Sequence, residues 1–238
     1  MEKTFWGGTL RRFRLPLLLL CLLPGLSFLS AFPTAVQRAT SVARRTSNKP
    51  SGPPLPSAPL GIVWPSKADG HGGVVVDLFL DLCCPFSKRL LHTVAGGVAA
   101  SYEGKVTFIF HPVAQPWHGQ SSFMHEAALA VLKIEGPEAF WGYAVEVCRR
   151  QEEFFDDSTF EKSRLQIYKE LVIIANEMGF DSSKIMARLQ LAGSGNSGNA
   201  VTQRMKWVTK FHRTRGVHVT PTVFVNGLEA GMFPKGVI

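Results

Sequence analysis

The amino-acid sequence predicts an α/β fold in which a small sheet carries a helical insertion between its second and third core strands. Two runs of β-branched and aromatic residues, 74–80 and 105–110, are separated by a helical stretch that opens at Pro85. A third run, 222–225, follows about a hundred residues that have helix signals and no strand signals. Two strands joined by a helix form a parallel pair with a right-handed crossover, so we expect a βαβ unit at the centre of the sheet.

The chain of 238 residues, 45% of them apolar, is long enough for one globular domain with its own core. Its net charge of +8 is concentrated ahead of that domain: residues 1–31 carry +3 and residues 32–60 carry +4, which leaves +1 for residues 61–238. Nucleic-acid binding needs a broad basic surface. A nearly neutral domain does not supply one, so we expect no nucleic-acid partner.

Residues 1–31 have the layout of a signal peptide. A basic region, 1–14, precedes an apolar stretch, 15–29, which a Pro-Gly pair interrupts and two small residues follow. This stretch is shorter than the roughly 20 residues of a membrane-spanning helix, and no other stretch approaches that length. We therefore expect cleavage, entry into the secretory pathway and no transmembrane segment in the mature protein; the alternative is an uncleaved anchor.

Residues 32–65 are predicted to be a transit-like segment followed by a proline-rich linker. Phe32 comes directly after the expected cleavage point, and the residues from there to Lys49 are rich in Arg, Ser, Thr and Ala without an acidic residue. This combination resembles the bipartite presequences of plastid proteins in algae with complex plastids. The alternative destinations are the ER lumen and the exterior of the cell. Six prolines between positions 50 and 65 predict a semi-rigid spacer, so we expect the folded domain at 66–238.

The insertion, at about residues 120–200, is expected to be helical, because its punctuation consists of helix caps and turns. The predicted helices are 121–132, opened by Ser121 or Ser122; 137–148, with Pro137 in its first turn; 158–178, opened by a capping box at Ser158 and Glu161 and ended at Gly179; one capped by Asp181; and, after the glycine-rich break 193–198, a last helix that ends near Gly216.

Cys84 is the strongest candidate for a reactive residue. It follows the first core strand directly and stands where a helix begins at Pro85. The positive end of the helix dipole and the unpaired backbone N–H groups there stabilise a thiolate. The alternative is that Cys84 is an ordinary buried cysteine.

Two motifs far apart in the chain carry a resemblance to a known family. Cys84-Pro85-Phe86-Ser87 follows the first strand, and Thr220-Pro221 precedes the third. With the order strand, helix, strand and helical insertion between them, these motifs resemble the DsbA-like branch of the thioredoxin superfamily over approximately residues 72–230.

That resemblance implies a thioredoxin-like fold in which Cys84 is the nucleophile and Pro221 is a cis-proline whose loop packs beside it. The backbone of Thr220 would pair with an extended peptide substrate, and Pro85, Phe86, Thr220 and Pro221 are the implied substrate-binding residues. The implied partners are protein or peptide thiols and disulfides.

Ser87 is a departure from the family pattern, because the family's oxidoreductases have a second cysteine at this position and serine cannot form the disulfide. We therefore predict a mechanism with one cysteine: Cys84 attacks a disulfide, Ser87 hydrogen-bonds the thiolate, and an external thiol such as glutathione resolves the adduct. No bound cofactor is expected. The alternative is a redox-inactive module that binds extended peptides or protein partners by strand-like pairing. A weaker alternative resembles the kappa-class glutathione transferases, whose nucleophile position holds serine; Cys84 argues against it.

The remaining cysteines are predicted to be structural, and the histidines near the end of the second strand could orient a substrate or line a groove. Cys83 and Cys148 are expected in the core, with a role of Cys148 as resolving partner of Cys84 as the alternative. The spacings of His111, His118 and His125 match no recognised ligand pattern, so no metal site is expected.

The C-terminal end of the sequence is shorter than the family pattern. The chain ends at Ile238, soon after the Asn226-Gly227 turn, where the family continues with another strand and a helix. We expect either a trimmed fold or a sequence that is incomplete at its C-terminus. An incomplete C-terminus would leave an edge and a face of the sheet exposed.

Overall fold

The computed structural model describes residues 54–64 and 73–230. The expected signal peptide and transit-like segment lie outside these residues, as does the C-terminal segment 231–238. The described residues belong to one structural unit. Within the described residues no helix is both long and apolar enough to span a bilayer.

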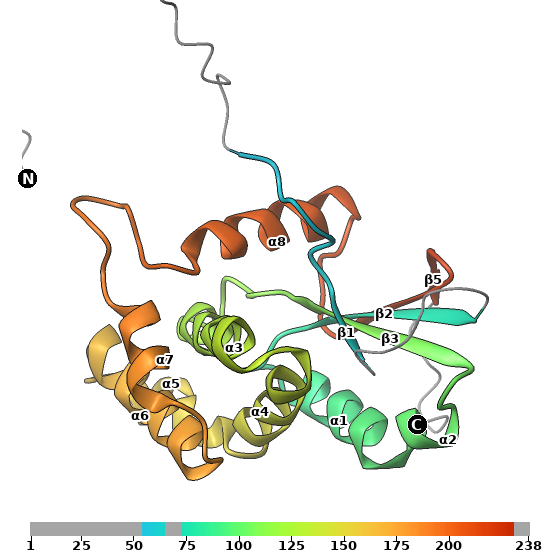
Figure 1. The fold of residues 1–238 in the computed structure, drawn as a ribbon, viewed down its shortest axis with the longest axis horizontal. Coiled ribbons are helices and arrows are strands. Elements are labelled where there is room, and N and C mark those ends of the chain that lie inside the picture. Colours follow the sequence, from blue (N-terminus) through green and yellow to red (C-terminus); the bar gives the residue numbers. More distant parts are fainter. Residues whose placement is uncertain (1–53, 65–72, 231–238) are drawn as a thin grey trace, which may run out of the picture. The chain divides into compact units, whose positions relative to one another are not determined.

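The centre of the fold is a mixed five-stranded sheet with the strand order β1-β3-β2-β4-β5 (Figure 1). β2 and β3 are parallel, as the sequence predicts, and the other neighbouring strands are antiparallel. The strands are β1 (Ile62–Trp64), β2 (Val74–Leu80), β3 (Val106–Pro112), β4 (Thr222–Val225) and β5 (Leu228–Ala230).

The helices fill the crossover between β2 and β3 and the insertion between β3 and β4, so the fold is the predicted mixed α/β arrangement with a helical insertion. The crossover contains α1 (Pro85–Thr93), a π-helical turn (Val94–Val98) and α2 (Ala99–Ser101). The insertion contains α3 (Ser121–Glu135), α4 (Pro137–Arg149), a 3₁₀ turn (Gln151–Phe154), α5 (Asp156–Thr159), α6 (Arg164–Glu177), α7 (Ser182–Leu189) and α8 (Thr202–Thr214).

The predicted helix 158–178 is wrong at its start. The capping box lies at Ser163, whose Oγ accepts from Gln166 N at 3.3 Å while Gln166 Oε1 accepts from Ser163 N at 2.7 Å. Ser158 Oγ instead donates to Glu152 O at 2.8 Å, at the end of the short α5 region. Two similar Ser-x-x-acid/amide patterns five residues apart give the same sequence signal, and only the packing selects the second.

β1 lies in the segment that the sequence assigns to the spacer, so the expectation that the fold begins only after Pro65 is wrong. Ile62 pairs with Phe110 in β3 and is 2% exposed, and Trp141 Nε1 donates to Ile62 O at 3.2 Å. The short apolar run 60–64 was hidden by the prolines on both sides of it. Its edge position in the sheet is the place where flanking prolines are tolerated.

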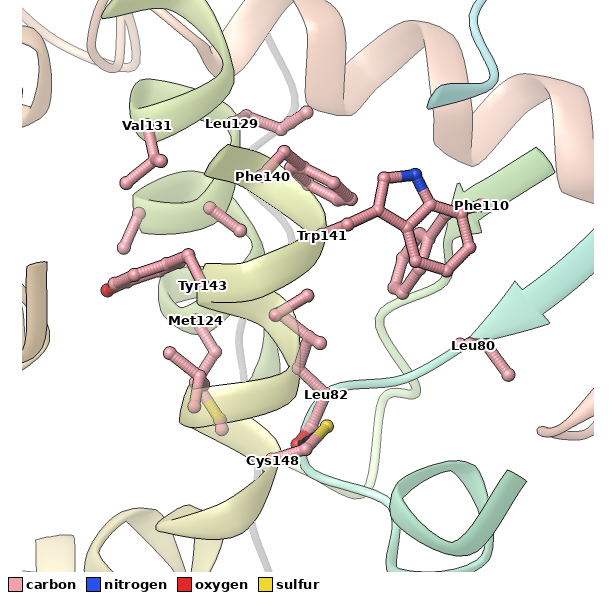
Figure 2. Packing of buried hydrophobic residues seen from close by; sticks show 14 of the residues in the cluster. Leu80, Leu82, Phe110, Met124, Leu129, Val131, Phe140, Trp141, Tyr143 and Cys148 are labelled. Carbon is pink, nitrogen blue, oxygen red and sulfur yellow. Dashed lines mark hydrogen bonds between the residues drawn. The ribbon is translucent and has the colours of Figure 1, made fainter. Parts of the chain in front are cut away.

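Each face of the sheet contributes side chains to a buried core. On one face Leu78, Leu80 and Phe110 join the main core with α1, α3 and α4. Figure 2 shows Phe140 and Trp141 of α4 packed against Phe110 of β3, with edge-on ring contacts of 5.1 and 5.6 Å. On the other face Phe79 packs with Phe224 of β4 and with Phe211 of α8. The alternation of β2 side chains between these two cores positions the end of the strand, where the candidate site lies.

Candidate active site around Cys84

Cys84 is the N-cap residue of α1. Its backbone is extended (φ −79°, ψ 123°), and Pro85, which has no N–H to leave unpaired, is the first helical residue. The Cys84 carbonyl accepts the first helical bond from Lys88 N at 3.0 Å, and Cys84 N donates to Asp81 O at 3.0 Å. The thiol therefore sits at the positive end of a nine-residue helix.

The loop before β4 reaches this thiol. Cys84 Sγ donates to the Thr220 carbonyl oxygen at 3.3 Å, although the two residues are 136 positions apart in the chain. The Thr220–Pro221 peptide bond is cis, and Thr222 Oγ1 donates to Val219 O at 2.8 Å at the end of the same loop. Only 5% of Cys84 is exposed, so the residue is buried where the loop contacts its thiol.

Ser87 lies one turn into α1 and is buried, with 1% exposed. Its Oγ accepts a hydrogen bond from Asp81 N at 3.2 Å. Among the described residues no hydrogen bond joins Ser87 to Cys84, because the Cys84 thiol points to the Thr220 carbonyl. The role of Ser87 as a partner of the thiolate stays a prediction.

Exposed apolar side chains stand on three segments near the site: α1, the loop before β4 and the loop after β3. Phe86 in α1 is 64% exposed, Val219 before the cis-proline 54%, and Trp117 in the loop after β3 59%. Pro85 is exposed as well. Exposed apolar groups on neighbouring loops are typical of surfaces that bind an apolar or extended partner.

Asp81 is the central residue that the sequence interpretation missed. Its side chain is fully buried directly behind the two cysteines and accepts four hydrogen bonds. The donors are Cys83 N at 2.8 Å and Ser121 Oγ at 2.6 Å on Oδ1, and Gln115 N at 3.0 Å and His118 Nδ1 at 2.8 Å on Oδ2. A carboxylate needs this many donors to be stable without water. The signal available in the sequence was an acidic residue between a buried strand and the cysteine.

Asp81 joins the three segments of the site. It binds the loop 81–84 through Cys83 N and the loop after β3 through Gln115 N. The Gln115 side chain then donates from Nε2 to His218 O at 3.2 Å, two residues before the Thr220 carbonyl that meets the thiol. The position of Thr220 over Cys84 is thus connected to Asp81 through one side chain.

Cys83 and Cys148 are buried free thiols. Burial, and after it the negative charge of Asp81, raises the pKa of Cys83 to about 12. The same two causes raise the pKa of Cys148, which is fully buried and donates from Sγ to Leu82 O at 3.6 Å (Figure 2). Both groups stay protonated near neutral pH, as expected for core cysteines, so neither is prepared to act as a nucleophile.

The histidines occupy separate places. His111 Nε2 lies 2.8 Å from Asp77 Oδ1, and His118 binds Asp81. His125 is fully buried, with Nε2 at 3.2 Å from Val113 O and 3.4 Å from Leu82 N, and burial lowers its pKa to about 4. His218 is exposed on the loop before the cis-proline. The described residues contain no group of three or more side chains arranged to hold a metal ion.

The region that contains this site is similar to known proteins. A family profile described as thioredoxin matches residues 70–231. No curated protein matches the chain. Among solved structures, the chain is similar to a proposed protein-disulfide isomerase from Pseudomonas syringae, with 25% identity, 74% of this chain and 91% of that chain covered, and a TM-score of 0.59.

Two further solved structures have the same fold. The MdbA thiol-disulfide oxidoreductase from Actinomyces oris has 20% identity and a TM-score of 0.53, with 72% of this chain and 77% of that chain covered. The MdbA enzyme from Corynebacterium diphtheriae has 18% identity and the same TM-score, with 72% and 84% covered. The matched region contains both Cys84 and the loop before β4.

Proposed function

Because the chain belongs to the thioredoxin family and has the fold of its DsbA-like thiol–disulfide oxidoreductases, we propose that it exchanges thiols and disulfides through a single nucleophilic cysteine, Cys84. One observation carries the proposal: the Cys84 thiol stands at the start of α1 and contacts the Thr220 carbonyl beside a cis-proline. A helix start favours thiolate, and the adjoining backbone is positioned to meet a substrate beside it.

The reaction has two exchange steps. The Cys84 thiolate attacks one sulfur of a substrate disulfide, so that a new S–S bond forms to Cys84 and the other substrate sulfur leaves as a thiolate. An external thiol, deprotonated, then attacks the substrate sulfur of this mixed disulfide. The new disulfide contains the external thiol and the substrate, and Cys84 leaves as the thiolate. No net oxidant or reductant is needed beyond the two thiol–disulfide pairs.

The need for an external thiol is inferred from the residues around Cys84. Ser87 stands where a resolving cysteine would be needed, and its hydroxyl has no sulfur chemistry. Cys83 and Cys148 are buried with raised pKa values, which makes them poor attacking groups. A small soluble thiol such as glutathione, without a tightly bound cofactor, is the resolving partner that fits these conditions.

The proposed substrates are extended protein or peptide segments that contain a disulfide. Such a segment would lie along the loop before β4, with its backbone beside Thr220 and its apolar side chains against Phe86 and Val219. Strand-like pairing accepts many sequences, because the backbone supplies the contacts. Ser87, one turn into α1 from the thiol, is proposed to support the thiolate by its hydroxyl once the Cys84 thiol leaves the Thr220 carbonyl.

A second candidate function is a redox-inactive module that binds extended peptides. The observation that favours it is the cover over Cys84, which is 5% exposed and donates its thiol hydrogen to Thr220. In this case the apolar surface of Phe86, Trp117 and Val219 binds the peptide and the thiol only holds the loop in place. Binding would then be independent of sulfur chemistry.

The proposed compartment follows from the leader, residues 1–31, which would direct the chain into the secretory pathway. The ER lumen, the exterior and a complex plastid all remain destinations of that route. In the ER lumen and outside the cell, protein disulfides are more frequent than in the cytosol.

The test uses the full chain with Cys21, Cys83 and Cys148 replaced by alanine, so that Cys84 is the only thiol. The protein is incubated with a glutathionylated peptide and analysed by mass spectrometry. We expect one mixed disulfide on Cys84, which added glutathione releases. Alkylation by iodoacetamide as a function of pH, on the same protein, measures the thiolate directly.

The matched control carries the additional change Cys84→Ser and should form no adduct. A second variant, Ser87→Cys in the otherwise native chain, restores a dithiol and should form an internal disulfide that no external thiol is needed to resolve. If Cys84 is alkylated only after the protein unfolds, the oxidoreductase proposal is wrong. Peptide binding that the Cys84→Ser change leaves unaltered would then support the binding module.

A further inference from the structure

The charge of the folded domain is divided between two parts of the chain. Residues 61–238 carry a net charge of only +1. Residues 120–181, which contain α3 to α6, have 12 acidic and 6 basic residues, whereas residues 182–228 have 7 basic residues and no acidic one. Five of those 7 lie in α8 or directly after it. The total of +1 is therefore the sum of an acidic part and a basic part, and α8 is the centre of the basic part.

Three of these cations form a row on α8, which lies on the opposite side of the sheet from α1 (Figure 1). The three buried residues of the helix define its inward face. At 3.6 residues per turn, Lys206, Lys210 and Arg213 fall within an arc of about 60° that faces away from them. All three are exposed. They follow one another along the axis at about 6 and 4.5 Å. We call these three residues the α8 row.

The α8 row has no carboxylate partner among the described residues, where every ion pair involves other cations. Arg204, half-buried on the same helix, donates from Nη2 to Leu60 O at 3.0 Å. Burial alone lowers its pKa, and no carboxylate offsets this effect. Arg204 Nε and Gln203 Nε2 are buried donors that have no acceptor in the described part of the chain. The helix therefore offers cations without anions and donors without acceptors.

The α8 row ends close to the Cys84 site. The chain folds back after α8, because Val217 N donates to His212 O in the last turn of the helix at 3.0 Å. Three residues then lead from Val217 to Thr220, a span of at most about 10 Å. The Thr220 carbonyl meets the Cys84 thiol. A partner segment that lies along the loop before β4 is thus within a few residues of the end of the row.

We propose that the α8 row is a docking surface for an extended, acidic segment of a partner protein. Alternate side chains of an extended strand are about 6.7 Å apart, close to the spacing of the row, and the long side chains of lysine and arginine can bridge the difference. A segment with Asp or Glu at every second position would therefore place one carboxylate opposite each cation. The proposal goes beyond thiol exchange and holds whether or not Cys84 is reactive.

Two other anionic partners fit the row less well. Proteins that bind a nucleic-acid backbone make roughly six to ten phosphate contacts, and three cations over about 10 Å of helix supply fewer. A helix that lies on a membrane inserts exposed apolar side chains between the lipids. α8 has no exposed large apolar residue, and Trp207, beside the row, donates from Nε1 to Pro54 O at 2.8 Å. An acidic protein segment is the partner that this surface favours.

The first experiment measures binding by fluorescence anisotropy with the full chain. The probe is a labelled peptide of four Glu-Ser repeats, and its Gln-Ser and Lys-Ser counterparts are the controls. We expect only the acidic peptide to bind, and its dissociation constant to increase several-fold between about 50 and 200 mM salt. The Cys84→Ala chain should bind equally well, so the result is independent of the proposed thiol chemistry. Equal binding of the Gln-Ser peptide would overturn the proposal.

The variants test whether the row itself is responsible. Lys206→Glu combined with Lys210→Glu should increase the dissociation constant by about tenfold, and Lys206→Arg combined with Lys210→Arg should retain binding. The matched control, Lys133→Glu combined with Lys169→Glu, makes the same change in net charge at exposed positions of α3 and α6 and should bind as the native chain does. An equal loss in this control would show that only the overall charge matters, which would overturn the docking surface.

The second experiment locates the bound peptide. A carbodiimide joins a carboxylate directly to a lysine amine in contact with it, and mass spectrometry identifies the linked residues. We expect the Glu-Ser peptide to be linked to Lys206 or Lys210. Links from these lysines to the acidic insertion of another chain, in the absence of peptide, would overturn the proposal in favour of a second copy. Tighter binding of an oligonucleotide of equal charge, or of vesicles of anionic lipid, would overturn it in favour of those partners.

Discussion

At its C-terminal end β2 runs into the hydrogen-bonded loops around Asp81, whereas the middle of the same strand lines an apolar cavity of about 390 Å³ between the sheet and the crossover segment. At the Asp81 end, four donors meet one carboxylate and each of them has a direction. At the other end, Val76 and Leu78 face a space that the described residues do not fill. Hydrogen bonds constrain the direction of the groups they join, whereas the burial of apolar surface is not directional.

α1 connects the two regions. Its first turn carries Cys84 and Ser87, and its later residues Leu90 and Thr93 line the cavity. The helix is therefore held rigidly at the reactive end and by apolar packing alone at the far end. This arrangement suits a site whose nucleophile must be aligned while the supporting helix tolerates substitutions. Three predictions test the contrast, beginning with the largest expected effect.

Asp81→Ala should have the largest effect on stability. The change leaves Cys83 N, Gln115 N, Ser121 Oγ and His118 Nδ1 buried without their acceptor. Each unsatisfied buried donor costs about 1 to 3 kcal/mol, and partial relaxation leaves an expected total of about 4 kcal/mol. Urea unfolding of the full chain measures this loss. A loss below about 1 kcal/mol would remove the contrast, because the polar end would then depend as little on single groups as the apolar end.

The matched variant is Asp81→Asn. Its amide oxygen can still accept from Cys83 N and Ser121 Oγ, and His118 can change its tautomer to accept from the amide. Gln115 N has no such option, because a backbone N–H is always a donor. We expect a loss of about 2 kcal/mol, intermediate between the native protein and Asp81→Ala.

His125 makes the polar end sensitive to pH. Burial lowers the pKa of its imidazole from 6.5 to about 4. Between these two values the unfolded chain binds a proton that the folded protein does not, so stability falls as the pH decreases through 6.5 toward 4. From pH 7 to pH 5 the loss is expected to be about 2 kcal/mol. Urea unfolding at a series of pH values measures it, in a range where most carboxylates do not titrate.

Two comparisons qualify that measurement. His125→Gln should reduce the slope between pH 7 and pH 5, and a remaining slope is expected because burial also lowers the pKa values of His212 and His92. Val106→Ala, at the cavity, should lower stability at every pH without changing the slope. An unaltered slope in the His125 variant would show that the pH dependence does not come from this end of the strand.

Periodicity was sufficient to predict the parts of the fold that carry long, uniform patterns. β2 and β4 have the predicted bounds, and the crossover between β2 and β3 gives the predicted parallel pair. β1 was missed because a strand of three residues is too short to show a periodic pattern. This strand is defined by its pairing with β3. The start of α6 was wrong because two capping patterns competed, and tertiary packing decided between them.

For a similar reason, only part of the candidate site could be predicted from the sequence. Cys84 can be identified because it directly precedes a predicted helix, and Pro221 because it directly precedes a predicted strand. Asp81 has no such pattern, because its donors come from residues 2 to 40 positions away. The contact between Cys84 and Thr220 spans 136 positions. A sequence indicates the position of a residue within its own helix, strand or loop. Contacts between residues of different elements become known only from the folded structure.

The smallest effect distinguishes two neighbouring leucines of α1. Leu91 is fully buried in the main core, whereas Leu90, at 7% exposed, lines the cavity. The cost of a leucine-to-alanine change increases with the number of surrounding atoms that lose a contact. We expect Leu91→Ala to cost about 3 to 4 kcal/mol and Leu90→Ala about 1 kcal/mol less, measured by urea unfolding.

The gap between the two costs follows from the space beside Leu90. Leu90 has atoms of the sheet on one side and the cavity on the other, so its replacement removes fewer contacts than the replacement of Leu91. Equal costs for the two leucines would mean that the cavity end of α1 is packed as tightly as the rest. The contrast between the Asp81 end of β2 and the cavity would then disappear.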